Sequence, residues 1–364
     1  MVYSTTMIGL SVVGSDISRE LLMSRMALQN GWDLTIIDPS NTSFVIGLLV
    51  PFLTWALHIG AEWVYKVVLP MIYALTPVIL YLVFRKMIGD LKAFYASMFF
   101  IMMPVFSLEI PTIGKSMVAE PLMASTLWVM FTDWKLRWKF PAVLVLVLLV
   151  IWAHYTIGLL FTGFFIVILV AGIVAKLIPK WRLFKGWAFP SWAVLTVIVV
   201  ALGSFVIYYS KVGSGLLTYY VGEIGGYYAN PAAITSNDVM THTINSSQLL
   251  QAGTGLDFFS VGWSGKLFRI VQYFTQFLVV AGCAWIIFKY NIAKNGVRLY
   301  RFPPEFIACM GGGLAILGAC VCIPYFGSLI NPTRYYHVAL FFLAPCFIVA
   351  FDAIVYLFKK KVLE

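Results

Sequence analysis

The stretch that decides the fold is residues 158–177, GLLFTGFFIVILVAGIVAKL. It carries one charge, Lys176, in a run of about 20 residues, the length that crosses the hydrocarbon core of a bilayer as a helix. The whole chain shares this character, because 61% of its 364 residues are hydrophobic and only 11% are charged. A soluble domain carries about 25% charged residues. The composition therefore predicts an integral membrane protein.

Further apolar segments have lengths that cluster near the same value, namely residues 65–85, 91–108, 116–132, 140–156, 188–209, 269–289, 305–325 and 336–358. Residues 43–59 are also apolar, but about 17 residues lie at the lower limit of the spanning range. We expect this segment, which contains Pro51, to lie along the outer interface or to dip into it. The predicted fold class is all-α, a polytopic transmembrane helix bundle with about nine spans plus an interfacial helix.

The basic residues predict the orientation of this bundle in the cell membrane. Most of the 25 lysines and arginines fall in alternate connections and in the C-terminal run Lys359–Lys361. Cytoplasmic loops carry the excess of Lys and Arg in multispanning proteins, so we expect the C-terminus to be cytoplasmic. This placement also accounts for the net charge of +10 without a nucleic-acid partner.

The same orientation divides the chain into four segments. Residues 1–64 form an external segment with the interfacial helix, and residues 65–209 form a six-span bundle. Residues 210–268 form a long external loop, and residues 269–364 form a three-span bundle. An external N-terminal segment favours one further helix before it in the natural protein, because insertion is simpler with a preceding span.

Some function classes find no support in the sequence. We see no P-loop, no dinucleotide fingerprint and no internal repeat. The cysteines fall in or near apolar segments and are predicted to be small buried hydrophobic residues rather than disulfides or metal ligands; they are Cys283, Cys309, Cys320, Cys322 and Cys346.

Residues 14–20, GSDISRE, form a short polar stretch with two acids and one base. If Ser15 or Asp16 caps a helix, the four-residue spacing places Asp16 and Glu20 on one face. Two such carboxylates share a cation, or divide the roles of general base and orienting group. The alternative is a helix cap followed by a solvated first turn.

Other ionisable groups near the hydrocarbon boundary are predicted to face the same external side, namely Lys115, Glu120, His154, Tyr155, Arg334 and His337. Their clustering at one leaflet predicts an active cavity there. The alternatives are structural. Arg334 and Lys115 would anchor at the interface, Glu120 would interact with a helix dipole, and His154 would be a hydrogen-bonded bundle residue.

With these pieces in order, the chain resembles the GT-C superfamily of polytopic glycosyltransferases, and more closely an archaeal family of multispanning proteins within it. The resemblance rests on Asp16-Ile17-x-x-Glu20, Ala119-Glu120, His154-Tyr155, Pro332-Thr333-Arg334 and Tyr336-His337. It covers nearly the full length. It implies transfer of a sugar from a polyprenyl (dolichyl) phosphate carrier to an acceptor on the external face, with inversion.

The resemblance also implies roles for individual residues. Asp16 would be the catalytic base, and Glu20 would orient the acceptor. Asp16 and Glu20 together would hold a divalent cation, Mg²⁺ or Mn²⁺, if one is used. Arg334 and Lys115 would neutralise the carrier phosphate as it leaves. The expected partners are the polyprenyl-phosphate-linked sugar and membrane lipids.

Two other functions stay open at this point. A flippase or transporter of lipid-linked sugars would share the external cavity, although transporters often show internal repeats and charged residues at mid-membrane. A non-catalytic membrane subunit of a larger complex would position a protein partner. Bound carrier without turnover would favour the first of these, and an obligate partner that copurifies would favour the second.

Overall fold

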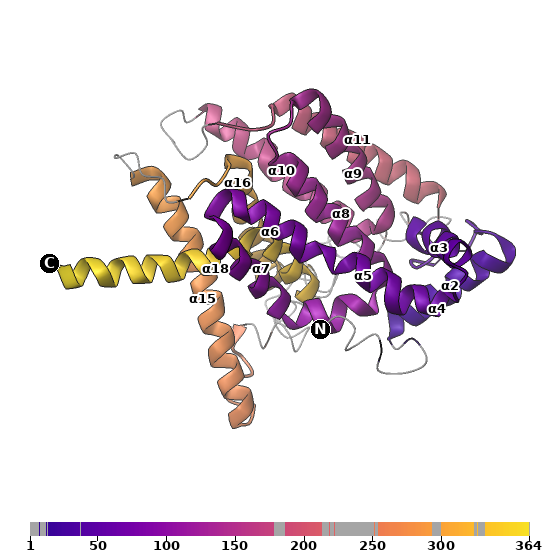
Figure 1. Cartoon of the computed structure of the whole chain (residues 1–364), viewed down its shortest axis with the longest axis horizontal. Coiled ribbons are helices and arrows are strands. Elements are labelled where there is room, and N and C mark those ends of the chain that lie inside the picture. The colour runs from indigo at the N-terminus through magenta and orange to yellow at the C-terminus, as the bar shows by residue number, and fades with distance from the viewer. Residues whose placement is uncertain are drawn as a thin grey trace. The chain divides into compact units, whose positions relative to one another are not determined.

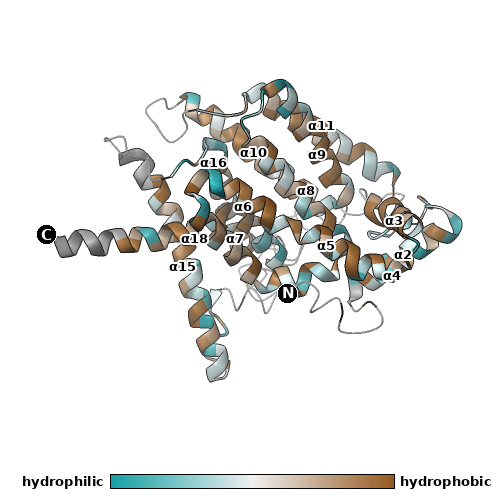
Figure 2. Ribbon diagram, viewed as in Figure 1, coloured by the Kyte–Doolittle hydropathy of each residue, from teal (hydrophilic) through white to brown (hydrophobic). Residues whose placement is uncertain are grey.

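The computed structural model describes residues 14–36, 38–177, 186–212, 254–292, 300–323 and 332–363, with a few isolated positions between these ranges. Every regular element in this part of the chain is a helix. The prediction of an all-helical fold is therefore confirmed. Figure 2 shows apolar residues along most of the helices and polar ones mainly where helices end. Most of the predicted external loop 210–268 lies outside the described residues.

Seven helices in the described ranges are long and apolar enough to cross a membrane, namely Ala61–Ile88, Leu136–Ala153, Tyr155–Leu177, Ser191–Lys211, Trp263–Ile287, Pro304–Cys322 and Pro332–Val355. The number rises to eight if Asp90–Met102 and Val105–Thr112 are one bent span. The predicted segment 116–132 is also helical and corresponds to α8 (Gly114–Met130), which has 17 residues. The helices thus lie at the positions of the predicted segments, but seven or eight of them in the described ranges qualify as spans, and the predicted count of about nine stays a prediction.

The chain divides into two compact units, each built from segments that are distant in sequence. The first unit comprises Met1–Val83, Ile101–Val170 and Ala188–Gly226. Its helices are α2 (Ser15–Asn30), η1 (Val45–Leu49), α3 (Val50–Leu57), α4 (Ala61–Trp63), η2 (Val64–Val68), α5 (Leu69–Tyr73), η3 (Val105–Glu109), η4 (Ile110–Thr112), α8, α9 (Leu136–Ala153), α11 (Ser191–Lys211) and most of α6 (Leu75–Ile88) and α10 (Tyr155–Leu177). Helix α8 packs between α5 and α9, and α9 packs on α11 (Figure 1).

Helix α8 forms the core of this unit. Nearly all of its side chains are buried, from Lys115 at its start to Met130 at its end. A helix that is buried on all sides shows no amphipathic pattern. Charged groups on such a helix must find partners inside the protein, because water cannot reach them. This makes Lys115 and Glu120 the informative side chains of α8.

The short apolar segment predicted at 43–59 is also helical, and it is too short to be a span. It runs from η1 into α3 over Val45–Leu57, with Pro51 in the first turn of α3. It ends at His58, which adopts a left-handed conformation with φ 54°. Trp55 is 73% exposed and Phe52 is 57% exposed. Such apolar side chains suit a membrane surface, and the interfacial position stays a prediction.

The second unit comprises Phe84–Phe100, Ala171–Trp187 and Tyr227–Glu364. Its main helices are α15 (Trp263–Ile292), α16 (Pro304–Cys322), α18 (Pro332–Leu363) and most of α7 (Asp90–Met102). Helix α18 packs against both α15 and α16. At Gly282 of α15 a Cβ atom would lie 1.8 Å from the carbonyl oxygen of Cys346, so only glycine permits this close contact with α18.

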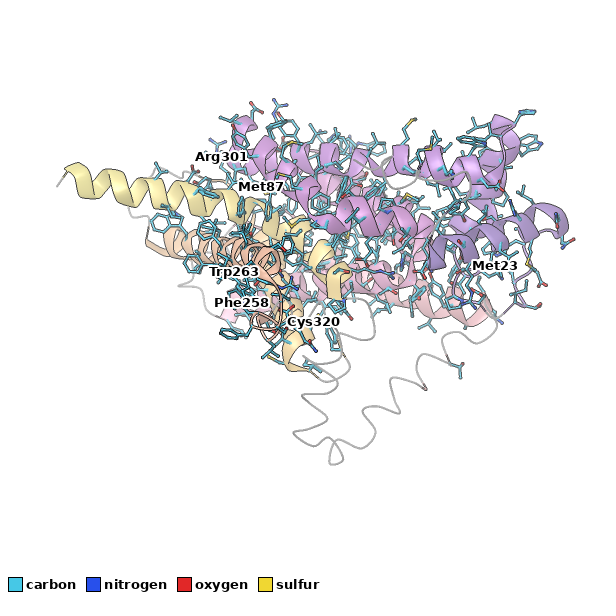
Figure 3. The ribbon with its side chains drawn as sticks, turned by 90° about the horizontal axis from the view of Figure 1, so that it is seen from below. Met23, Met87, Phe258, Trp263, Arg301 and Cys320 are labelled. Carbon is cyan, nitrogen blue, oxygen red and sulfur yellow. The ribbon has the colours of Figure 1, made fainter. Side chains whose placement is uncertain are left out.

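A polar cluster joins three segments of the second unit. Asp352 of α18 pairs with Lys92 and accepts a hydrogen bond from the Tyr300 hydroxyl at 2.5 Å. The adjacent Arg301 donates its backbone N–H to the carbonyl of Met87 at 2.9 Å, and the two residues lie side by side in Figure 3.

The cysteines are unbridged. Four of them are buried, as predicted, but Cys322 is exposed because it is the last residue of α16. The prediction of burial is therefore wrong for Cys322.

Candidate functional site

The polar stretch at residues 14–20 begins helix α2, so the condition under which Asp16 and Glu20 share one face is met. The cap differs, however, because Gly14 occupies the N-cap position and neither Ser15 nor Asp16 does. Gly14 has φ 136°, and a Cβ there would lie 3.2 Å from Cβ of Thr112. Glycine thus allows α2 to start against the segment that precedes α8. Asp16, in the first turn of α2, is partly exposed.

Glu20 lies one turn after Asp16 and is completely buried, with 0% exposure. Its Oε2 accepts the backbone N–H of Gly114 at 2.7 Å, so its carboxylate sits at the N-terminus of α8. Its Oε1 lies 3.8 Å from Nζ of Lys115. A carboxylate at this end of a helix meets both unpaired N–H groups and the positive end of the helix dipole.

Gly114 makes this contact possible. A Cβ atom at position 114 would lie 2.4 Å from Cε1 of Tyr65 and 2.7 Å from Oε2 of Glu20. The Tyr65 hydroxyl is in turn 2.9 Å from Oγ of Ser24, which donates to the carbonyl of Ile46. Tyr65 and Ile46 both belong to π-helical turns, η2 and η1, and such turns occur often at functional sites.

Burial raises the pKa of Glu20 from 4.5 to about 7. The positive charge of Lys115 and the N–H groups of Gly114 and Lys115 oppose this rise, whereas the negative charge of Asp16 adds to it. The charge effect of Asp16 supports the prediction that the two acids share one face of α2. Both protonation states of Glu20 are therefore populated near neutral pH.

The raised pKa of Glu20 predicts a pH-dependent stability. The folded protein binds this proton more tightly than the unfolded chain between about pH 4.5 and 7. The stabilisation is therefore complete below pH 4.5 and is lost as the pH rises through 7, and it amounts to about 3 kcal/mol. We measure the melting temperatures of the wild type and of Glu20→Gln in detergent at pH 5 and at pH 8. We expect the wild-type value minus the variant value to decrease from pH 5 to pH 8. A difference that does not change with pH would contradict this assignment.

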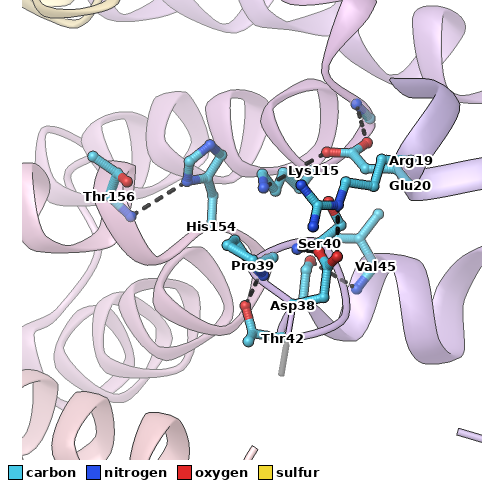
Figure 4. A network of polar contacts seen from close by, with 12 residues as sticks. Arg19, Glu20, Asp38, Pro39, Ser40, Thr42, Val45, Lys115, His154 and Thr156 are labelled. Carbon is cyan, nitrogen blue, oxygen red and sulfur yellow. Dashed lines mark hydrogen bonds and ion pairs between the residues drawn. The ribbon is translucent and has the colours of Figure 1, made fainter. Parts of the chain in front are cut away.

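Lys115 contacts a second group besides Glu20. Its ammonium lies 5.5 Å from the centre of the Tyr155 ring, within the range of a cation–π contact. The rings of Tyr155 and His154 are 5.4 Å apart. Nδ1 of His154 accepts the backbone N–H of Thr156 at 3.3 Å, so the neutral ring carries its proton on Nε2. Figure 4 shows Lys115 extending toward the Glu20 carboxylate, with His154 nearby.

Hydrogen bonds connect the loop after α2 to this region. The Ser43 hydroxyl donates a hydrogen bond to the backbone carbonyl of Ala153 at 2.6 Å, at the point where α9 ends and α10 is about to begin. The Asp38 carboxylate accepts hydrogen bonds from Nε of Arg19 at 2.6 Å and from the backbone N–H of Ser40 at 2.7 Å (Figure 4). This ion pair was not predicted from the sequence, although Arg19 lies within the polar stretch itself.

The other predicted site residues have different surroundings. Glu120 is buried farther along α8 and accepts a hydrogen bond from the Tyr73 hydroxyl of α5. Arg334 and His337 belong to the second unit, on α18. His337 is fully buried there, 4.6 Å from the centre of the Phe100 ring. The structure thus brings together Asp16, Glu20, Lys115, Tyr155 and His154 in the first unit.

Asp16 and Glu20 were predicted to bind a divalent metal ion. Among the described residues, no three His, Cys, Asp or Glu side chains gather as a metal site would require. Both oxygens of Glu20 face positive groups, Gly114 N–H and the Lys115 ammonium, rather than open space. This donor set does not suit a cation at Glu20, and binding of Mg²⁺ or Mn²⁺ at Asp16 stays a prediction.

Comparisons with known proteins give two matches. No curated protein matches the chain. Among solved structures, the chain is similar to ArnT from Cupriavidus metallidurans bound to undecaprenyl phosphate, at 12% identity and a TM-score of 0.44, over 97% of this chain and 75% of that one. A family model described as "Predicted membrane protein (DUF2206)" matches residues 144–364, which is more than half of the chain. The chain therefore belongs to the DUF2206 family of membrane proteins.

Proposed function

We propose that this chain is a membrane glycosyltransferase that moves a sugar from a polyprenyl-phosphate carrier to an acceptor on the external face. The observation that carries the proposal is the grouping of Asp16 and Glu20 on α2 with the buried Lys115 at the start of α8. Transfer from a lipid phosphate needs a base for the acceptor and a positive charge for the leaving group.

The two acids have different roles in this proposal. Asp16 is partly exposed and takes the proton of the acceptor hydroxyl as general base. Glu20 has no exposed surface, and its Oε2 is bonded to Gly114. It therefore positions α8 and Lys115 rather than contacting the acceptor, which revises the orienting role suggested by the sequence.

The reaction is a single displacement. The hydroxyl oxygen of the acceptor attacks the anomeric carbon from the face opposite the phosphate, and the bond from that carbon to the phosphate oxygen breaks. The electron pair of this bond leaves with the polyprenyl phosphate, and the hydroxyl proton moves to Asp16. Lys115 stabilises the negative charge of the leaving phosphate, because it is held where water is excluded. The role predicted for Arg334, which belongs to the second unit, stays a prediction.

Substitution of Lys115 tests the proposal. In membranes supplied with a labelled polyprenyl-phosphate sugar, we expect Lys115→Gln to lower the rate of transfer by roughly 10²-fold, since one group that stabilises the transition-state charge is lost. Lys135→Gln is the matched control, because Lys135 is an exposed lysine before α9. Carrier that binds and crosses the bilayer without any transfer would instead favour a flippase.

A further inference from the structure

The contact between Glu20 and Lys115 is an incomplete ion pair. The distance of 3.8 Å between Oε1 and Nζ exceeds the 2.7–3.2 Å of a hydrogen bond. Within the described residues, Oε1 of Glu20 has no hydrogen-bond partner, and neither has Oγ of the adjacent Ser116, which is 1% exposed. Lys115 is 6% exposed, and its ammonium approaches Oε1 of Glu20 only to 3.8 Å. Buried polar groups are normally satisfied, so these three point to a ligand.

The charges show which ligand fits. The ammonium of Lys115 and the N-terminus of α8, a helix of 17 residues, are both positive. Such a combination binds anions, phosphate groups above all. Here the Glu20 carboxylate already lies against both positive groups. An anionic ligand that reaches Lys115 must therefore compete with a carboxylate that belongs to the protein.

We infer that Glu20 is a built-in competitor: the phosphodiester of a lipid-linked donor binds by drawing the Lys115 ammonium away from the Glu20 carboxylate. This inference rests on the proposed function for the choice of ligand. It assigns Glu20 an autoinhibitory contact in addition to its role in positioning α8.

The two oxygens of Glu20 separate these roles. Oε2 is held by Gly114 N–H at 2.7 Å, a short hydrogen bond that fixes the start of α8. Oε1 has no hydrogen-bond partner among the described residues and lies 3.8 Å from Nζ of Lys115, which ends a flexible four-carbon side chain. When a phosphodiester draws Lys115 away from Oε1, the hydrogen bond between Oε2 and Gly114 N–H therefore stays in place. The ring of Tyr155 lies 5.5 Å from the same ammonium and gives Lys115 a cation–π contact besides Glu20.

The test uses the full chain in nanodiscs and a polyprenyl methyl phosphodiester, which carries one negative charge that does not titrate near neutral pH. Its affinity is measured at pH 8, where Glu20 is mostly ionised. Glu20→Gln keeps an oxygen for Gly114 N–H and removes the charge. We expect this variant to bind the diester about 10-fold more tightly, because the diester no longer competes with the Glu20 carboxylate for the Lys115 ammonium.

Two controls define the origin of that gain. Asp33→Asn removes one charge from an exposed position of the same external segment, and its affinity should equal that of the wild type. The double variant Glu20→Gln/Lys115→Gln should lose the gain, because the competition acts through Lys115. If Glu20→Gln does not give a monodisperse elution profile, Glu20→Met, which has similar volume and no charge, replaces it.

Equal or weaker binding by the uncharged variants would overturn the inference and leave Glu20 as a positioning residue only. Absence of diester binding to any of the proteins would overturn it as well. The proposed function fails separately. Tighter binding by Glu20→Gln without sugar transfer by the wild type would support the inference and reject the enzyme, whereas transfer with unchanged affinity would do the reverse.

Discussion

Asp16→Asn is expected to lower the rate of sugar transfer by 10²- to 10⁴-fold, the contribution typical of a general base. The amide has nearly the same shape as the carboxylate but does not accept the acceptor proton. Asp16 lies in the first turn of α2 and is partly exposed, so it is accessible to an acceptor in a way that Glu20 is not. The initial rate of transfer from a labelled carrier, in nanodiscs that contain the full chain, measures this effect.

The result is specific only if donor binding is retained. We expect the KM for the donor to change little in Asp16→Asn, because the base acts on the acceptor and not on the phosphate. Asp33→Asn serves as the control, since Asp33 is an exposed acid whose carboxylate accepts hydrogen bonds from Thr35 in the loop after α2. Transfer by Asp16→Asn at more than a tenth of the wild-type rate would remove Asp16 as the base.

The helices of this fold could be predicted from the sequence because their signal is local. Runs of about 20 apolar residues have one stable form in a bilayer, a helix that satisfies its own backbone. The polar start of the helix at residues 15–30 indicated only that a helix could begin there, and the spacing of Asp16 and Glu20 then placed the two acids on one face. The cap was not predictable. Gly14 holds that position because its backbone, with φ 136°, lies against Thr112.

The partners of Glu20 could not be predicted, because Gly114 lies 94 residues away along the chain. Composition and periodicity carry no information about such a contact. One signal was available: a lysine directly after a glycine, followed by an apolar helix, indicates a cation that begins a buried element and needs a partner. His337, whose place at a helix start indicated a cavity, lies 4.6 Å from the centre of the Phe100 ring, and its cavity role stays a prediction.

Gly114→Ala is expected to damage both stability and activity, although it adds a single methyl group. The new Cβ would lie 2.4 Å from the Tyr65 ring and 2.7 Å from Oε2 of Glu20, distances that force one of these groups to move. Overpacking of a core costs about 1–3 kcal/mol, and loss of the bond between Gly114 N–H and the Glu20 carboxylate costs about 1.5–3 kcal/mol. We expect a lower melting temperature in detergent and a transfer rate reduced by at least roughly 10-fold.

The direction of this effect depends on the site and not on helix propensity, since alanine favours a helix over glycine by about 1 kcal/mol. Gly203→Ala tests this point, because a Cβ at Gly203 of α11 meets no atom within 4 Å, so we expect that variant to be as stable as the wild type or more so. Tyr65→Leu added to Gly114→Ala should restore part of the lost stability by making room at the start of α8. A Gly114→Ala protein that melts like Gly203→Ala would mean that α8 does not begin against Glu20, and the site would then lose the contact on which Lys115 depends.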